Sequence, residues 1–274
     1  MNEYKTLYHE LGLPEQLISI AFGKIKLCRG TDSQPTNCYG FPPAMVPIWS
    51  NPDAMIYTAY WKHWFSSREP SFVELFVTNS YSLREISRGM DQLLQLIVLQ
   101  EITFDDDLTE NTKLLAKKLG VKNINELDQI TIEHGDNPRG LLLISDFKDS
   151  GPLSAYKDAK EYTGDFPNEH MQINQNSLSN ICTLEVYGEL EKKILASPDC
   201  PYWFKAKNKK DLFYQYLSEN EYSHAWFTLN SRGWLFKDVR KALQALGNAV
   251  DDSKFHALVE AWCSLNHSDY NDGY

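Results

Sequence analysis

The chain has 274 residues, a formal net charge of −10 at pH 7, 42% hydrophobic residues and 23% charged residues. This composition is typical of a folded protein, and the length allows one large core or two smaller ones. The acidic excess argues against nucleic acid and anionic membranes as ligands, because both need clustered lysine and arginine. There is no apolar run of about 18 residues and no signal-peptide pattern, so we expect a cytoplasmic protein.

The five cysteines are scattered, odd in number and never arranged as CxxC. This spacing favours neither a disulfide framework nor a zinc cluster. We expect mostly buried thiols in a reducing compartment. The cysteines are Cys28, Cys38, Cys182, Cys200 and Cys263.

The N-terminal part is predicted to contain a short helix followed by an antiparallel sheet. Pro14 suits the start of a helix over 13–22, because its missing amide would have no partner there. Residues 54–77 are rich in tyrosine, tryptophan, phenylalanine and valine, and turn residues at 66–70 divide them. This pattern predicts two antiparallel strands.

Apolar residues recur every three or four positions over 83–101 and predict a helix that packs on the sheet. Ser82 and Glu85 have the spacing of a capping box at its start. Asp105, Asp106 and Asp107 follow, and three adjacent carboxylates cannot all be buried, so the chain is expected to reach the surface there.

We place a domain boundary at this acidic run, which divides the chain into an α+β domain over 1–104 and a mainly helical domain over 105–274. A helix over 111–119 is predicted to end at Gly120, and 140–147 is a buried-strand candidate. Residues 148–180 lack periodicity and predict a long irregular connection. Further helical segments are expected near 125–129, 184–195, 210–218, 235–246 and 253–265, with a frayed tail after 266.

The motifs of common active sites are absent from the sequence. It contains no GxGxxG or GxxxxGK[ST] loop, no GxSxG elbow and no HExxH pair, so we predict no catalytic, cofactor or metal site. Two carboxylate–imidazole neighbours, at 133–134 and 169–170, are compatible with a general base but also with ordinary surface loops. Cys182 and Cys200 could each act as a nucleophile with a distant histidine, but a lone cysteine in an apolar setting more often packs in the core.

The segment 57–69 is unusually aromatic. If it alternates as a strand, Trp61 and His63 share one face while Tyr60 and Trp64 share the other. If one aromatic face is exposed, it suits a protein interface. A platform on which sugars stack is a further alternative. If a helix covers each face of the sheet, the same residues belong to the core. The basic run 205–210 is expected to be a solvated helix entrance. The candidate partner-binding residues are Tyr60, Trp61, His63, Trp64, Arg68, Glu69, Asp105, Asp106 and Asp107.

The order of elements in residues 1–104 resembles the SUKH superfamily of bacterial immunity proteins. The similarity rests on LPEQL at 13–17, FPPAMVPIW at 41–49, the aromatic hairpin up to Val77 and the closing helix SLREISRGMDQLLQLIVL. It implies a non-enzymatic protein that binds a toxin domain, often a nuclease, through a sheet face and an acidic surface.

Our leading hypothesis is therefore a cytoplasmic immunity or inhibitor protein that neutralises a toxin or another basic protein partner. One alternative is a hydrolase or transferase whose site combines Glu133, His134, Asp136 and Asp146. Another is a structural or scaffold subunit.

Overall fold

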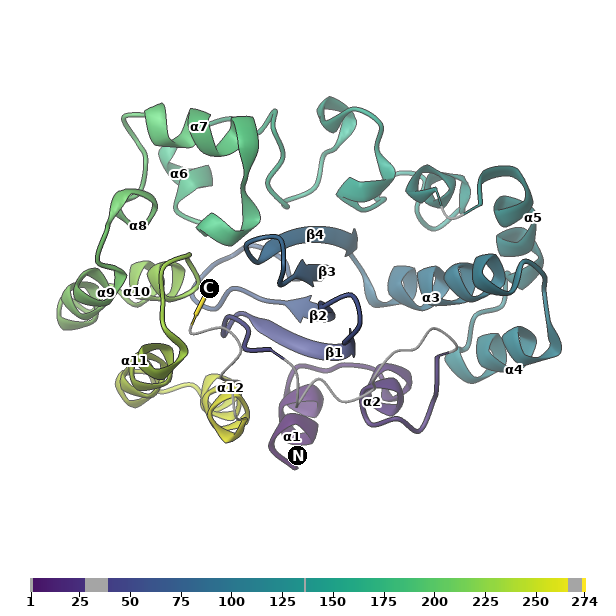
Figure 1. The fold of residues 1–274 in the computed structure, drawn as a ribbon, viewed down its shortest axis with the longest axis horizontal. Coiled ribbons are helices and arrows are strands. Elements are labelled where there is room, and N and C mark those ends of the chain that lie inside the picture. Colours follow the sequence, from purple (N-terminus) through teal and green to yellow (C-terminus); the bar gives the residue numbers. More distant parts are fainter. Residues whose placement is uncertain (1, 28–38, 136, 266–272) are drawn as a thin grey trace.

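A four-stranded antiparallel sheet lies at the centre of the fold, with helices on both sides of it (Figure 1). The computed structural model describes residues 2–27, 39–135, 137–265 and 273–274. The predicted α+β class is confirmed, with the sheet near the N-terminus and a mainly helical C-terminal half.

The strands follow one another as a simple meander, in the order β1-β2-β3-β4. Their bounds are β1 Met45–Asn51, β2 Ile56–Trp61, β3 Ser71–Phe76 and β4 Ser82–Ser87. Strands β2 and β3 pair antiparallel from Ile56↔Phe76 to Trp61↔Ser71, which confirms the hairpin predicted within 54–77.

The helix predicted over 83–101 is wrong in its first part. Residues 82–87 form β4, whose Leu83 pairs with Leu75 of β3, and helix α3 (Met90–Asp105) starts only after Gly89. Glu85 is no capping residue, because its side chain accepts hydrogen bonds from Tyr162 and Leu153. At these residues, pairing with the neighbouring strand determines the structure, and the helical spacing of the apolar residues does not.

The N-terminal helices are α1 (Asn2–Glu10) and α2 (Glu15–Ala21), and Pro14 directly precedes α2, as predicted. After α3 come α4 (Glu110–Leu119), which ends at Gly120 in the left-handed conformation as expected, and α5 (Ile124–His134).

The strand predicted at 140–147 is wrong. A 3-10 helix, η2 (Pro138–Leu143), occupies the first half of this stretch, and no strand forms in the rest of it. Pro138 has the fixed φ that suits the start of a helical turn, and the side chain of Asn137 caps it by accepting the amide of Arg139. Residues 148–180 contain short elements of three or four residues, which confirms the predicted irregular connection; they are η3 (Leu153–Ala155), η4 (Ala159–Glu161) and α6 (Gln175–Leu178).

The C-terminal half continues with a series of mostly short helices. They are η5 (Thr183–Glu185), α7 (Gly188–Ala196), α8 (Tyr202–Lys205), α9 (Lys209–Ser218), α10 (Tyr222–Leu229), α11 (Phe236–Ala249) and α12 (Ser253–Ser264). Four of them match the predicted segments, whereas α8 and α10 were not predicted.

One hydrophobic core runs across the boundary proposed at residue 105. It contains sheet residues such as Trp61 together with Trp226 of α10 and Trp262 of α12, each at most 1% exposed. The indole Nε1 of Trp262 donates to the backbone oxygen of Phe41 over 3.1 Å. The acidic run thus lies at the surface as predicted, but it does not divide the chain into two separate cores.

The last two residues are docked rather than frayed. The backbone amide of Tyr274 donates to the oxygen of Trp234, the amide of Trp234 donates back to Tyr274, and the Tyr274 hydroxyl donates to Leu229. A Cβ on Gly273 would lie 1.6 Å from the Trp234 oxygen, so this close strand-like contact requires glycine. Residues 267–272, where fraying was also predicted, lie outside the described residues.

Within the part of the chain that the structure describes, no helix combines the length and the apolar character needed to cross a membrane.

Candidate functional site

The predicted partner-binding residues do not form one surface. Trp61, His63 and Trp64 are 1%, 3% and 5% exposed, so they belong to the core. The ring of Trp64 packs against those of Trp226 and Phe255, because α10 and α12 cover this part of the hairpin. The alternative of a covered aromatic sheet therefore describes these side chains, and they offer no contact area to a partner in this conformation.

The acidic run lies elsewhere, at the last residue of α3 and in the turn that leads to α4. Asp106 and Asp107 are exposed, whereas Asp105 is half-buried and accepts hydrogen bonds from the hydroxyls of Thr109 and Thr112. Helix α3 has 16 residues and a length of about 24 Å. This length separates the acidic run from the residues at the start of α3.

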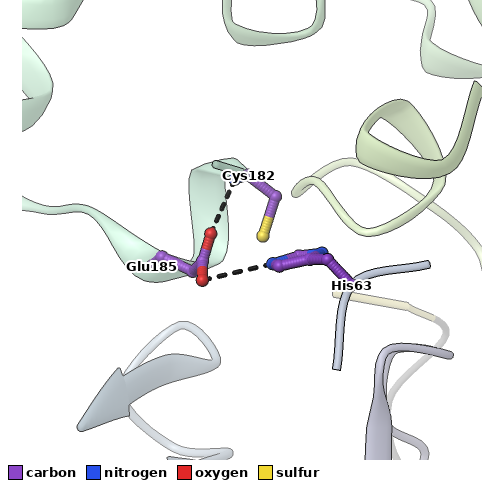
Figure 2. Close-up of side chains that lie close together, drawn as sticks. All are labelled: His63, Cys182 and Glu185. Carbon is purple, nitrogen blue, oxygen red and sulfur yellow. Dashed lines mark hydrogen bonds and ion pairs between the residues drawn. The ribbon is translucent and has the colours of Figure 1, made fainter. Parts of the chain in front are cut away.

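Buried Glu185 is the centre of a network of polar contacts, and Figure 2 shows its carboxylate beside His63 and Cys182. Its Oε1 lies 2.5 Å from the guanidinium of Arg68, 3.2 Å from Nε2 of His63 and 2.9 Å from the indole nitrogen of Trp61. Its Oε2 accepts the backbone amide of Cys182 over 2.8 Å. Residues 61–68 and 182–185, more than a hundred positions apart, are thereby held together.

The charges in this network are set by burial and by pairing. Burial alone would raise the pKa of Glu185, but Arg68 and His63 outweigh it and hold that pKa well below its ordinary value. Burial lowers the pKa of His63 despite the opposing effect of Glu185. Nδ1 of His63 accepts from Trp226 over 3.3 Å. A neutral imidazole that carries its proton on Nε2, toward Glu185, fits both observations.

The combination of His63, Cys182 and Glu185 invites a catalytic or metal-binding interpretation, because their ligand atoms lie within 4.8 Å of one another. Burial raises the pKa of the Cys182 thiol well above its ordinary value, and Glu185 raises it further, which disfavours the thiolate that a nucleophile or a metal ligand needs. Arg68 already supplies a cation at the Glu185 carboxylate. The arrangement therefore suits a structural ion-pair network better than a reactive centre.

Among the described residues of the enzymatic alternative, no hydrogen bond or ion pair joins Asp146 to Glu133 or His134. His134 lies 3.7 Å from Glu133 on an exposed helix end. Asp146 instead accepts a hydrogen bond from Gln95 over 2.8 Å, and Asp136 lies outside the described residues. His170 forms a second surface cluster, 3.1 Å from Glu169 and 3.4 Å from Asp158.

A cavity of about 460 Å³ with both charged and apolar lining residues opens where the sheet meets the start of α3. We call it the α3 pocket. Three of the predicted residues, Tyr60, Arg68 and Glu69, line it. The irregular segment 148–180 closes one side of it, through Ser150, Asp165 and Phe166. The sequence did not predict that Ser150, Asp165 and Phe166 line this pocket, because a sequence does not indicate which loop packs beside a strand.

The basic run 205–210 is not fully solvated, since Lys209 is only 6% exposed. Its ammonium donates to the backbone oxygen of Trp203, and burial lowers its pKa to about 8. The ordinary pKa is 10.5, so between about pH 8 and 10.5 the unfolded chain binds more protons than the folded one.

The free energy of unfolding of the wild type, relative to a Lys209→Met variant, is therefore expected to rise with pH across this window. Urea denaturation at both ends of the window measures it. Lys207→Met, at an exposed position, is the control. If the difference in the free energy of unfolding between the wild type and Lys209→Met stays constant or falls as the pH rises, the lowered pKa of Lys209 is contradicted.

Searches of this chain against family models, curated proteins and solved structures find no match.

Proposed function

We propose that this chain is an immunity or inhibitor-type protein that binds a basic protein domain through the C-terminal end of α3 and the turn that follows it. We call residues 104–107 the acidic turn. The observation that carries the proposal is the exposure there of a large aromatic side chain, Phe104 at 57%, directly beside Asp105, Asp106 and Asp107. Exposed aromatics supply contact area, and neighbouring carboxylates select and steer a partner of opposite charge.

The acidic turn is held in a defined shape, which lowers the entropic cost of binding. Asp106 ends α3 in the left-handed conformation, with φ 54°. The Asp107 carboxylate accepts the amide of Leu108, and Asp105 is held by two threonine hydroxyls. The carboxylates of Asp105 and Asp107 are thus positioned before a partner arrives.

The overall charge of −10 supports the same class of partner, because long-range attraction raises the rate of encounter with a basic domain. The sequence resemblance to the SUKH superfamily points in the same direction. The contact surface proposed here differs from the aromatic sheet face expected from sequence, since that face is buried.

Co-expression with the product of the neighbouring gene tests this function. If that product is a toxin domain, the wild type is expected to restore growth, and a variant with Asp105→Asn, Asp106→Asn and Asp107→Asn to restore it less well. The matched control removes three exposed charges elsewhere through Asp199→Asn, Glu219→Gln and Glu221→Gln. No rescue by the wild type, or equal loss with both triple variants, would contradict the proposed surface.

A further inference from the structure

The α3 pocket contains an arginine, Arg88, whose guanidinium forms no direct ion pair among the described residues, although its charge lowers the pKa of Glu85 in the same pocket. Among the described residues, no ion pair or hydrogen bond involves the Arg88 guanidinium; its central carbon lies over the ring of Tyr162, 5.7 Å from the ring centre. Arg68, the other arginine of the pocket, is bound to Glu185. Arg88 is therefore the guanidinium available to an anionic group of a ligand.

The start of α3 adds backbone donors beside Arg88. Gly89 precedes the helix and has no side chain to cap the amides of Met90 and Asp91, whereas the amides of Arg88 and Gly89 already donate to the side-chain oxygen of Gln92. Gly89, Met90 and Gln92 all line the pocket. Uncapped amides and the positive end of the helix dipole favour an anion at this position.

Ser71 gives an independent indication that a ligand completes the pocket. It lines the cavity at 7% exposure, and its hydroxyl has no hydrogen-bond partner among the residues described. A buried hydroxyl without a partner is unfavourable, so its persistence calls for an explanation. A polar ligand atom would supply the missing bond.

The same pocket presents carboxylates that would repel a simple anion. Glu69 and Asp165 are exposed at its rim, and within the described residues neither forms an ion pair. Deeper in the pocket, burial raises the pKa of Glu85, although the hydroxyl of Tyr162, 2.5 Å away, the amide of Leu153 and the charges of Arg88 and Arg68 oppose the shift. A ligand that satisfies the whole site must therefore carry both signs of charge.

We infer that the α3 pocket binds a small zwitterion of the α-amino acid class. Its carboxylate lies against Arg88 and the first amides of α3, its ammonium group faces Glu69 and Asp165, and its polar atoms reach Ser71. The cavity volume of about 460 Å³ falls in the range of small-molecule sites. This inference does not rest on the proposed function, because it uses none of the acidic turn.

Isothermal titration of the full chain with the common L-α-amino acids tests this inference. For each amino acid that binds, the matching amine without the carboxylate and the matching acid without the amine are titrated as well. At least one amino acid is expected to bind, with both single-charge analogues weaker by about 10-fold or more. Arg88→Gln should weaken binding by a similar factor, whereas Arg139→Gln, at an exposed arginine outside the pocket, should not.

Ser71→Ala separates a ligand-binding role from a purely structural one. The variant should bind the amino acid more weakly, while the melting temperature of the ligand-free protein stays the same or rises, because an unpaired buried hydroxyl has been removed. The inference is overturned if no amino acid binds, if a single-charge analogue binds equally well, if Arg139→Gln weakens binding as much as Arg88→Gln, or if Ser71→Ala leaves binding unchanged.

Discussion

Replacing Glu185 with alanine is expected to lower the free energy of unfolding by about 3–5 kcal/mol, because removing one partner of a buried pair leaves the other charge unpaired. Arg68 would lose the carboxylate 2.5 Å away, and the indole of Trp61 and the amide of Cys182 would lose their acceptor. Urea denaturation at neutral pH measures the loss. The pKa of Glu185 is lowered on folding, so the wild-type advantage is present above about pH 4.5 and is lost as the pH falls toward the folded pKa.

Two further variants test whether pairing, rather than packing, explains this loss. The double variant Arg68→Met with Glu185→Leu removes both charges and should be more stable than Glu185→Ala alone. Arg84→Ala, which breaks the exposed pair with Glu74, should cost about 1 kcal/mol or less. A double variant as unstable as the sum of its single variants would argue against a coupled network.

Replacing Trp262 with alanine is expected to cost about 3–5 kcal/mol, because the side chain is fully buried and its removal leaves a large cavity. The substitution also breaks the hydrogen bond from α12 to Phe41. Since the core crosses residue 105, the sheet should lose stability together with the C-terminal helices. Hydrogen exchange resolved along the chain measures this: amides of β1 and β2 should lose protection along with those of α12.

Tyr202→Ala, at a position that is 74% exposed, should change stability by about 0.5 kcal/mol or less and serves as the control. Two separate unfolding transitions in the Trp262 variant, with the sheet retained in the second, would instead support independent N-terminal and C-terminal domains.

Elements with strong local signals were predictable from the sequence. Pro14 precedes α2, Gly120 ends α4 and the aromatic stretch forms β2 and β3, because capping and strand propensity act over a few residues. Strand β4 was predicted as helix because its apolar residues, Leu83 and Ile86, are three positions apart, which is a helical spacing, whereas the strand buries residues on both of its faces. Only the pairing of Leu83 with Leu75 decides between helix and strand.

The candidate sites were much less predictable. The acidic turn could be located because adjacent carboxylates must remain near water. The burial of Trp64 could not be inferred, because it depends on α10 and α12, well over a hundred residues further along the chain. The same holds for Trp61, whose indole donates to Glu185 of η5. For the same reason the sequence does not distinguish Glu185 from an ordinary surface glutamate, although Glu185 is the partner of Arg68 and His63.

The association rate of purified protein with the product of the neighbouring gene, measured by stopped flow against salt concentration, tests the proposed function most directly. The acidic turn predicts fast association at low salt that slows as salt is added, and a rate about 10-fold or more lower at low salt when Asp105, Asp106 and Asp107 are replaced by asparagine. Contradictory results would be the absence of a complex, or a rate that depends neither on salt nor on these three residues.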